Sequence, residues 1–582
     1  MNNTSKRPTY FTNKIRKGAL TICGIILLAL NSSAQNIDEI IDKVKNKDPL
    51  VLSGNITTGM SAYAANGIDN RRNPFAFYTT ISPTVSFRGF SLPFSFTYRD
   101  QKGSFSQPFQ RIKINPTYKW ISVGYGNVTM DLNPYVFSGQ YYRGYSLQLT
   151  PGKFRFKAGY GYLENPLAQI DTIVEGTYIL PAYKRKAITA LVGYGSPKTH
   201  VDLTFFRAKD LIAQSEVGDI NPDLVTPQEN LALGLDFGFN FLKKFNFKAN
   251  VGASAYTSNI NSVGDFGLSN EIPILQSLSN VFTYNLTSKL QFAGDASINY
   301  RLKHFGTGIE YKRVSPGYQT LGTYYFQEDF QNITLKMNVS TPKNKIRLNG
   351  SGGIQTNNLN GLRESTRTRK ILNTTLILSP WKSFNTTIRF ANFQSDRTPS
   401  FNRIGDTLKF TQSTENYSIL PLLMLKGEKN STTISAMVNY QKLIDLGLNL
   451  QGYSGIDNYT GNLNVSVYNR STDVGIAGSL LYNKNIMGLN ENQRIGLNGT
   501  YSRKVLKKKM SLSGNLGFMA NTLNNESDGF TITTNASMNY KIKRKISAGI
   551  NGNILFRNST NQSYQEFRAT ARVSYQFTTK KS

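Results

Sequence analysis

The chain has 582 residues, with 67 Lys and Arg against 35 Asp and Glu, and a formal net charge of +32. Two His and one Cys are too few for zinc clusters, multi-histidine metal sites or a thiol nucleophile. Charged residues make up 18% of the chain, and Tyr (32), Phe (35) and Gly (48) are abundant. This composition favours strands and turns over helices.

The first 34 residues are expected to be an export signal. Residues 1–18 contain five basic residues and no acidic one, and an apolar run of 12 residues extends from Ala19 to Leu30 before the small residues that end at Ala34. This order is typical of a secretory signal peptide cleaved after Ala34. The alternative, a transmembrane helix, requires about 20 apolar residues. Cleavage removes Cys23 and leaves 62 basic against 35 acidic residues, a net charge of +27.

Residues 35–49 predict a short helix in the periplasm or the lumen. Asn36 is a suitable N-terminal cap, and apolar residues recur at helical spacing from Ile37 to Val44. Pro49 ends the pattern.

From residue 50 onward the sequence alternates between apolar and polar residues with a period of two. In 530–543 the apolar set includes Phe530, Ile532 and Met538, while Thr, Asn, Ser and Lys occupy the other positions. The same division recurs in 231–241 and in most other segments. Two architectures have this pattern: a soluble sandwich with its apolar face inside, and a membrane barrel with its apolar face outside.

Connection lengths decide between these architectures, because tight turns alternate with long loops along nearly the whole chain. Long loops are expected at 164–181, 208–229, 258–287 and 396–410. Outer-membrane barrels have this asymmetry, with short periplasmic turns and long extracellular loops. The fold class predicted for 50–582 is therefore all-β, a single large antiparallel transmembrane β-barrel. The tight turns are expected near Arg88, Pro151, Ser196, Lys243, Lys303, Pro342, Trp381, Gly427, Leu506 and Arg544.

The pattern predicts 26 strands, within a range of 24 to 28, the first at about 50–63 and the last at about 564–577. An even number places both ends of the barrel on the periplasmic side, as export through the inner membrane requires. The strands near 121–130 and 411–425 have the weakest pattern.

The last strand carries an apolar set that ends in Val573, Tyr575 and Phe577. It resembles the C-terminal recognition strand of Gram-negative outer-membrane β-barrel proteins, although five residues follow the final aromatic. The resemblance is architectural and extends over the chain after the signal. It implies an outer-membrane location, contact with outer-membrane lipid and lipopolysaccharide, and insertion by the barrel assembly machinery. Val573, Tyr575 and Phe577 would form the assembly signal.

Basic residues concentrate at the tight turns, for example at Lys243, Lys244 and Lys509, and acidic residues in the long loops. One interpretation is solubility together with attraction to anionic headgroups. The other is a rim that docks an acidic periplasmic or surface protein.

A third set of charged residues falls on the polar faces of the strands and is expected to line the lumen. An excess of cations on a low-dielectric wall favours anions in a pore. The alternative is a ladder of ion pairs between neighbouring strands, for instance among Asp295, Arg301, Glu310 and Lys312, with no role in transport. The basic members are Arg99, Arg155, Lys157, Arg301, Lys312, Lys336, Arg347, Lys541, Arg568 and Arg572, and the acidic members are Asp202, Asp236, Asp295 and Glu310.

A barrel of this size encloses a lumen wide enough to require filling by loop 258–287, by the helix over 36–48 or by a partner protein. His200 and His304 both fall at periplasmic turns, which argues against catalysis. We expect no enzymatic activity, no metal or other cofactor, and no nucleic-acid partner. Two functions fit: a porin-like channel for polar or anionic solutes, or a structural or secretion-associated barrel that holds a partner protein or surface complex.

Overall fold

The computed structural model describes residues 50–99, 111–166, 181–212, 225–264, 281–323, 327–399, 410–445 and 455–579. The expected signal peptide and the helix predicted over 35–49 lie outside these residues. Within them the structure is all-β apart from one 3₁₀ turn, Pro342–Asn344. No helix in this part of the chain is long and apolar enough to span a bilayer.

The strands follow one another as antiparallel hairpins. Most of them match or exceed the 9–11 residues that a tilted strand needs to cross a bilayer. The first half of the wall consists of β1 (Val51–Asn66), β2 (Phe75–Phe87), β3 (Phe90–Arg99), β4 (Arg111–Ile114), β5 (Thr117–Tyr118), β6 (Ile121–Thr129), β7 (Tyr141–Leu149), β8 (Phe154–Glu164), β9 (Lys184–Ser196), β10 (Thr199–Leu211), β11 (Glu229–Phe241), β12 (Phe245–Thr257) and β13 (Ser288–Arg301). The second half consists of β14 (Phe305–Val314), β15 (Phe330–Ser340), β16 (Ile346–Asn357), β17 (Ser365–Trp381), β18 (Phe384–Pro399), β19 (Phe410–Lys426), β20 (Asn430–Asp445), β21 (Ile456–Asn469), β22 (Val474–Met487), β23 (Asn490–Val505), β24 (Met510–Leu523), β25 (Glu526–Lys543), β26 (Ile546–Asn558) and β27 (Tyr564–Thr578).

The segments β4 and β5 are two pieces of one strand. Both pair with β3 and with β6, and the register is the same on either side of Pro116, whose ring nitrogen has no proton to donate. The barrel therefore has 26 strands, as predicted. The two strands with the weakest sequence pattern are present as β6 and β19.

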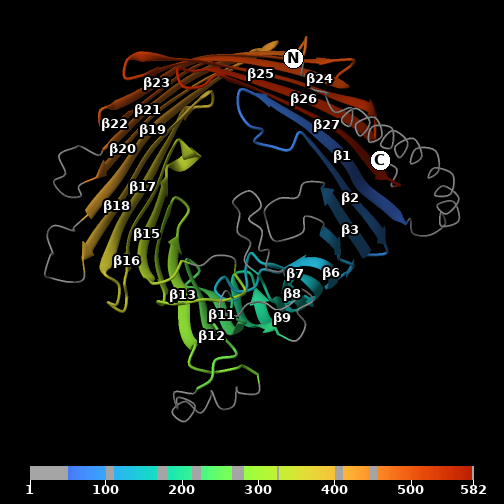
Figure 1. Ribbon diagram of the computed structural model, residues 1–582, viewed down its shortest axis with the longest axis vertical. Helices are drawn as coiled ribbons and strands as arrows, with labels where there is room; N and C mark the ends of the chain where they lie inside the picture. Colours follow the sequence, from blue (N-terminus) through green and yellow to red (C-terminus); the bar gives the residue numbers. More distant parts are fainter. Residues whose placement is uncertain are drawn as a thin grey trace, which may run out of the picture.

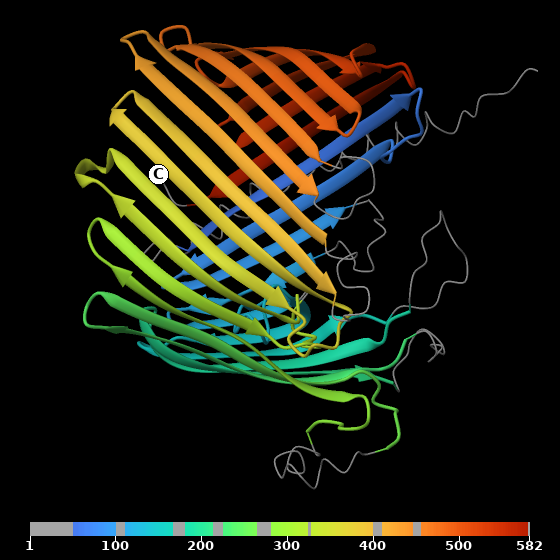
Figure 2. The same ribbon diagram turned by 90° about the vertical axis from the view of Figure 1, so that its left-hand side faces the viewer.

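The barrel closes where the last strand pairs with the first. β27 runs antiparallel to β1 from Ser53 opposite Thr578 to Asn66 opposite Gln565. Figure 1 shows the strands as a ring in which the blue and red ends of the described chain lie side by side. Figure 2 shows the strands running obliquely across the wall, the tilt that closure of a barrel requires. No edge of the sheet is left unpaired at this seam.

The outer face of the wall is apolar and exposed. Leu203, Leu335 and Leu497, on three well-separated strands, have 59%, 57% and 61% of their surface accessible. Their neighbours in each strand project to the opposite face, where Ser, Thr, Asn and charged residues predominate. An apolar outer belt on a closed barrel is the arrangement that a bilayer stabilises.

The buried core lies on the inner face of β6 to β14, beneath two inward-folded segments, 130–140 and 315–323, which we call the shelf. Val136 and Phe137 of the shelf are completely buried and pack against inner-face residues such as Phe206 and Tyr142. The two segments are joined by a hydrogen bond of 3.1 Å from the amide of Ser138 to the carbonyl of Gly322.

Loop 258–287, predicted as a candidate to fill the lumen, does not fold inward over its described ends. The amide of Leu286 donates to the carbonyl of Gly264 at 3.2 Å, so the two ends pair with each other. Figures 1 and 2 show this lime-coloured segment projecting away from the ring. The shelf takes the inner position instead, because glycines of β11 and β12 leave room for it.

Candidate functional site

A single lateral row of inner-face residues connects many of the predicted lumenal charges. In an antiparallel barrel, directly opposed residues project to the same face. From one strand to the next, the register sets the following residues opposite one another: Arg155, Gly193, Asp202, Asp236, Asn250, Asp295, Lys312, Asn332, Gln355 and Arg369. The row therefore brings together residues that are far apart in the sequence.

Arg155 and Asp202 form an ion pair across Gly193. Arg155 donates from Nη2 and Nε to Oδ1 of Asp202, at 2.6 and 3.2 Å, and from Nη1 to the carbonyl of Gly195 at 2.6 Å. Gly193 lies between them because a Cβ there would come within 1.8 Å of Oδ1 of Asp202. This cation is held by the wall.

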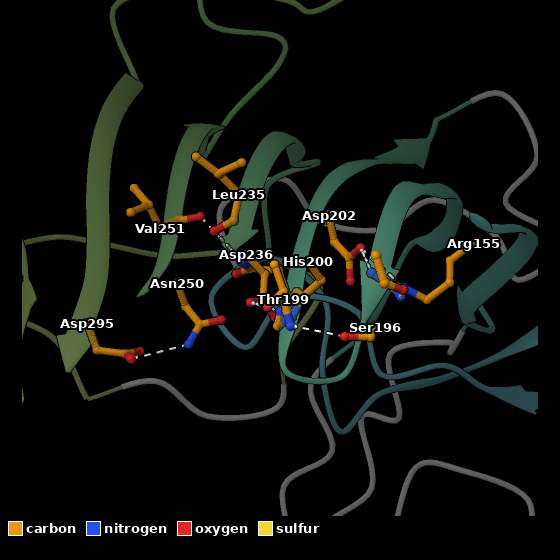
Figure 3. A network of polar contacts seen from close by, with 12 residues as sticks. Arg155, Ser196, Thr199, His200, Asp202, Leu235, Asp236, Asn250, Val251 and Asp295 are labelled. Atoms are coloured by element: carbon orange, nitrogen blue, oxygen red, sulfur yellow. Dashed lines mark hydrogen bonds and ion pairs between the residues drawn. The ribbon is translucent and has the colours of Figure 1, made fainter. Parts of the chain in front are cut away.

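The next positions of the row continue as hydrogen-bonded acids (Figure 3). His200 Nε2 lies 3.0 Å from Oδ1 of Asp236. Asp295 accepts hydrogen bonds from Nδ2 of Asn250 at 3.2 Å and from Oη of Tyr135, a shelf residue, at 2.6 Å. The shelf is thus tied to the charged row as well as to the apolar core.

The ladder of pairs forms with partners other than those suggested by sequence. Asp295 bonds to Asn250 and Tyr135, whereas Glu310 pairs with Lys336 on the next strand. Lys312 lies over the rings of Tyr135 and Phe330, at 5.5 and 5.7 Å from their centroids. Asp295 and Arg301 do not pair.

A second group of ion pairs, which sequence reasoning missed, lies toward the long-loop ends of β8 to β11. Arg185 donates from Nε to Asp210 at 2.8 Å and from Nη1 to Glu164 at 3.1 Å. Glu229, with none of its side chain exposed, accepts from Arg207 at 2.8 Å and lies 3.1 Å from Nζ of Lys209. Arg207, Lys209 and Glu229 occupy apolar-face positions of β10 and β11 and so interrupt the alternation of polar and apolar residues at the strand ends. That interruption is the signal that could have revealed them.

The remaining predicted lumenal cations behave differently. Lys157 donates to the carbonyl of Asp131 at 3.3 Å. The side chain of Arg99 lies outside the described part of the molecule. Among described residues, no carboxylate lies within ion-pair distance of the following five cations, which we call the free cations: Arg301, Arg347, Lys541, Arg568 and Arg572.

Two recesses in the inner wall are lined by arginines. One, of about 550 Å³, lies at the seam and includes Arg72, Arg568 and Arg572. The other, of about 310 Å³, lies near the long-loop ends of β16 and β17 and includes Arg367 and Arg369. The second recess also includes Glu328, which pairs with Arg363.

Histidine and acidic residues assemble no metal site in the part of the chain that the structure describes. No group of three or more His, Cys, Asp or Glu side chains with metal-binding geometry occurs within the described ranges. His200 and His304 lie at or beside the turns that join β9 to β10 and β13 to β14, the two short turns at which the sequence places them.

A closed antiparallel wall of 26 strands has an apolar outer belt and surrounds a polar, charged interior. The protein is a transmembrane β-barrel of the outer-membrane type. The strand resembling an assembly signal is its closing strand: Tyr575 and Phe577 lie 5.7 Å apart between ring centroids, opposite Ile56 and Gly54 of β1.

A family model described as "Putative MetA-pathway of phenol degradation" matches residues 482–582 of the barrel. A search of curated proteins gives no match.

Three solved structures that match this chain have low sequence identity to it. The P pilus usher (PapC) translocation pore is 12% identical, covers 90% of this barrel and 99% of its own chain, and has a TM-score of 0.34. The FrpB iron transporter from Neisseria meningitidis is 11% identical, with coverages of 93% and 82% and a TM-score of 0.36. OccAB4 of Acinetobacter baumannii is 8% identical, with coverages of 68% and 98% and a TM-score of 0.28.

Proposed function

We propose that this barrel is an outer-membrane channel for polar solutes with a preference for anions. The observation that carries the proposal is the division of the lumenal charges. Cations such as Arg155 and Lys336 are neutralised by carboxylates, whereas the five free cations have no such partner among described residues. Along β25 to β27, Lys541, Arg568 and Arg572 therefore leave an excess of positive charge on the described inner face.

A positive field in this position affects ions strongly, because the lipid and protein around the lumen have a low dielectric constant and concentrate the field in the water. Arginine and lysine side chains lining a pore raise the local concentration of anions and exclude cations. The shelf narrows the path on the opposite side, where Arg155 pairs with Asp202 and Arg185 with Asp210. An anion would accordingly pass along the wall formed by the C-terminal strands.

The chemistry of the inner face favours polar solutes. The family model that matches 482–582 is named for phenol degradation. In this segment, however, inner-face positions such as Asn515, Ser537 and Thr570 carry amide and hydroxyl groups, with Arg568 and Arg572 beside them. These groups replace water around a charged or hydroxylated solute better than around an apolar ring.

Ion selectivity of the purified barrel in planar bilayers tests the proposal. Under a KCl gradient we expect a reversal potential that indicates chloride preference. Replacing the two seam arginines, Arg568→Gln and Arg572→Gln, should reduce that preference because the lumen loses two free positive charges. The matched control replaces Lys343 and Lys382, exposed at periplasmic turns, with Gln.

The control removes the same net charge outside the lumen and should have the smaller effect. Cation preference, or equal effects of the two double variants, would contradict the proposed selectivity. A protein that conducts no current and copurifies with a periplasmic or surface protein would favour the alternative of a scaffold that holds a partner.

A further inference from the structure

The recess at the seam has the composition of an anion-binding site. It is lined by β25, β26, β27, β1, β2 and the coil after β1, and it encloses about 550 Å³. Its charged side chains are Arg72, Arg568 and Arg572, and no acidic residue lines it. Volumes of about 300–1,000 Å³ are typical of small-molecule sites.

Gly549 lines the recess, and a second glycine, Gly59, lies in the same lateral row of the wall. The register sets Asn539, Gly549, Arg572, Gly59 and Tyr78 in one lateral row across β25, β26, β27, β1 and β2. A Cβ on Gly59 would come within 2.5 Å of the Tyr78 ring, and one on Gly549 within 3.2 Å of Nε of Arg572. The ring and the guanidinium therefore lie across the glycines, along the wall, and leave the space above them open.

The guanidinium of Arg572 is oriented but not neutralised. Its Nη2 donates to Oδ1 of Asn539 at 3.3 Å, and no carboxylate is within ion-pair distance among the described residues. Arg568 projects to the same face of β27, four residues earlier, with Thr570 between them. An arginine held by a neutral amide keeps its charge and most of its five N–H donors available to a ligand.

The next lateral row supplies neutral polar groups. Four residues lie opposite one another on the adjacent strands β25, β26, β27 and β1, and all four line the recess: Ser537, Asn551, Thr570 and Ser61. Hydroxyl and amide groups of this kind donate to and accept from the hydroxyls of a solute. The site thus combines an oxyanion-binding part with a part suited to hydroxyl groups.

We propose that the seam recess binds a small hydroxylated solute that carries an oxyanion, a carboxylate or a phosphate. The oxyanion would lie against Arg572 and Arg568, which can donate paired hydrogen bonds to two of its oxygens. The Tyr78 ring and the hydroxyl and amide row would contact the remainder of the solute. This inference deepens and rests on the proposed channel function, because it names the solute class that the lumen would select.

Block of the ion current tests the site. Glucuronate serves as the carboxylate probe, glucose 6-phosphate as the phosphate probe and glucose as the uncharged control. We expect saturable block by glucuronate, by glucose 6-phosphate or by both, and none by glucose. The acid with the lower half-blocking concentration identifies the preferred oxyanion. Arg572→Gln should raise the half-blocking concentration about tenfold, because a charge-assisted hydrogen bond contributes on the order of 1.4 kcal/mol or more.

Gly549→Ala separates the geometry of the site from its charge. It preserves every charged group, but its Cβ comes within 2.8 Å of Oδ1 of Asn539 and 3.2 Å of Nε of Arg572. It therefore disturbs the hydrogen bond that orients Arg572 and should weaken block severalfold. Gly552→Ala, in the same strand, is the matched control because nothing lies within 4 Å of its added Cβ, and Lys382→Gln controls for net charge. Both controls should leave block within about twofold of the original protein, well below the tenfold step that corresponds to 1.4 kcal/mol.

Two results would overturn the site. The first is block that does not saturate, and the second is an equal effect of Arg572→Gln and Lys382→Gln, which would indicate a diffuse field. These results leave anion-selective conductance intact, so they are distinguishable from failure of the channel proposal. If the barrel conducts no current, equilibrium dialysis of the detergent-solubilised barrel with labelled glucuronate or glucose 6-phosphate shows whether the recess binds the solute. Binding that Arg572→Gln weakens would support the site, and absence of binding would refute it.

Discussion

At the scale of single residues, the inner wall uses glycine to make room for charged side chains. Two glycines show this use of space: Gly193, which lies beside Asp202, and Gly549, which lies beside Arg572. In the first the space holds an ion pair, and in the second it holds a cation without a carboxylate. Replacing either glycine with alanine adds a methyl group to this space and therefore tests the role of the neighbouring charge.

Gly193→Ala should destabilise the barrel by on the order of 1–3 kcal/mol, because the new Cβ displaces Asp202 and leaves Arg155 without its carboxylate. Denaturant unfolding in detergent micelles measures the effect, with Gly478→Ala as the control since its Cβ meets nothing within 4 Å. In an Asp202→Ala background, Gly193→Ala should cost much less. An equal cost in both backgrounds would show that the pair is not the cause.

Asp473, in the turn between β21 and β22, gives a pH-dependent prediction. Hydrogen bonds from Tyr468 and from Lys508 lower the pKa of Asp473. A depressed pKa means that the ionised carboxylate contributes stability above the ordinary pKa of about 3.9, and this contribution disappears as the pH falls through the lower folded value.

The difference in unfolding free energy between the original protein and Asp473→Asn should accordingly be constant at neutral pH and vanish in acid. Tyr468→Phe should shrink the same difference, because it removes the first of the two hydrogen bonds. A difference that is independent of pH would contradict the assignment.

At the scale of elements, the shelf is the feature that makes one half of the inner wall unlike the other. Asn133 donates to the carbonyls of Leu235 and Val251, both at 3.3 Å, and Thr320 donates to Oδ1 of Asn230 at 3.0 Å. These bonds fasten coil to the sheet and satisfy polar groups that would otherwise be buried without partners.

Replacing residues 132–138 with a short Gly-Ser turn should increase single-channel conductance, because the shelf occupies part of the lumen. Stability should fall at the same time, since Phe206 and Ala232 become exposed to water. Tyr135→Phe is the milder companion variant: it removes the hydrogen bond to Asp295 but keeps the ring, and should change conductance little. Unchanged conductance after the larger replacement would show that ions do not pass beside the shelf.

At the scale of the whole molecule, the barrel and its strand number could be predicted from the sequence because each strand by itself shows the period-two alternation. The ends of β1 and β27 were predicted within about three residues, the uncertainty expected of strand boundaries. The shelf could not be predicted, since 130–140 and 315–323 are coil and carry no periodicity. The ion-pair partners also required the register: Arg155 and Asp202 meet only because both oppose Gly193.

A field that arises from the whole wall should depend on salt. The Debye length falls from about 10 Å at 0.1 M to about 3 Å at 1 M ionic strength. The preference for chloride should therefore be larger in dilute than in concentrated KCl. A preference that stays constant over this range would indicate selection by size or by tightly coordinated ions.

Closure of the barrel has a consequence for biogenesis. Gly59 and Tyr78 belong to the first hairpin, whereas Gly549 and Arg572 belong to the last, and only the pairing of β1 with β27 brings them together. An arrested assembly intermediate would therefore have the shelf and the ion pairs of β8 to β11 but no seam recess. Ligand binding at the recess would report that the final strand has been joined, so the solute proposed here could serve as a probe of completed insertion.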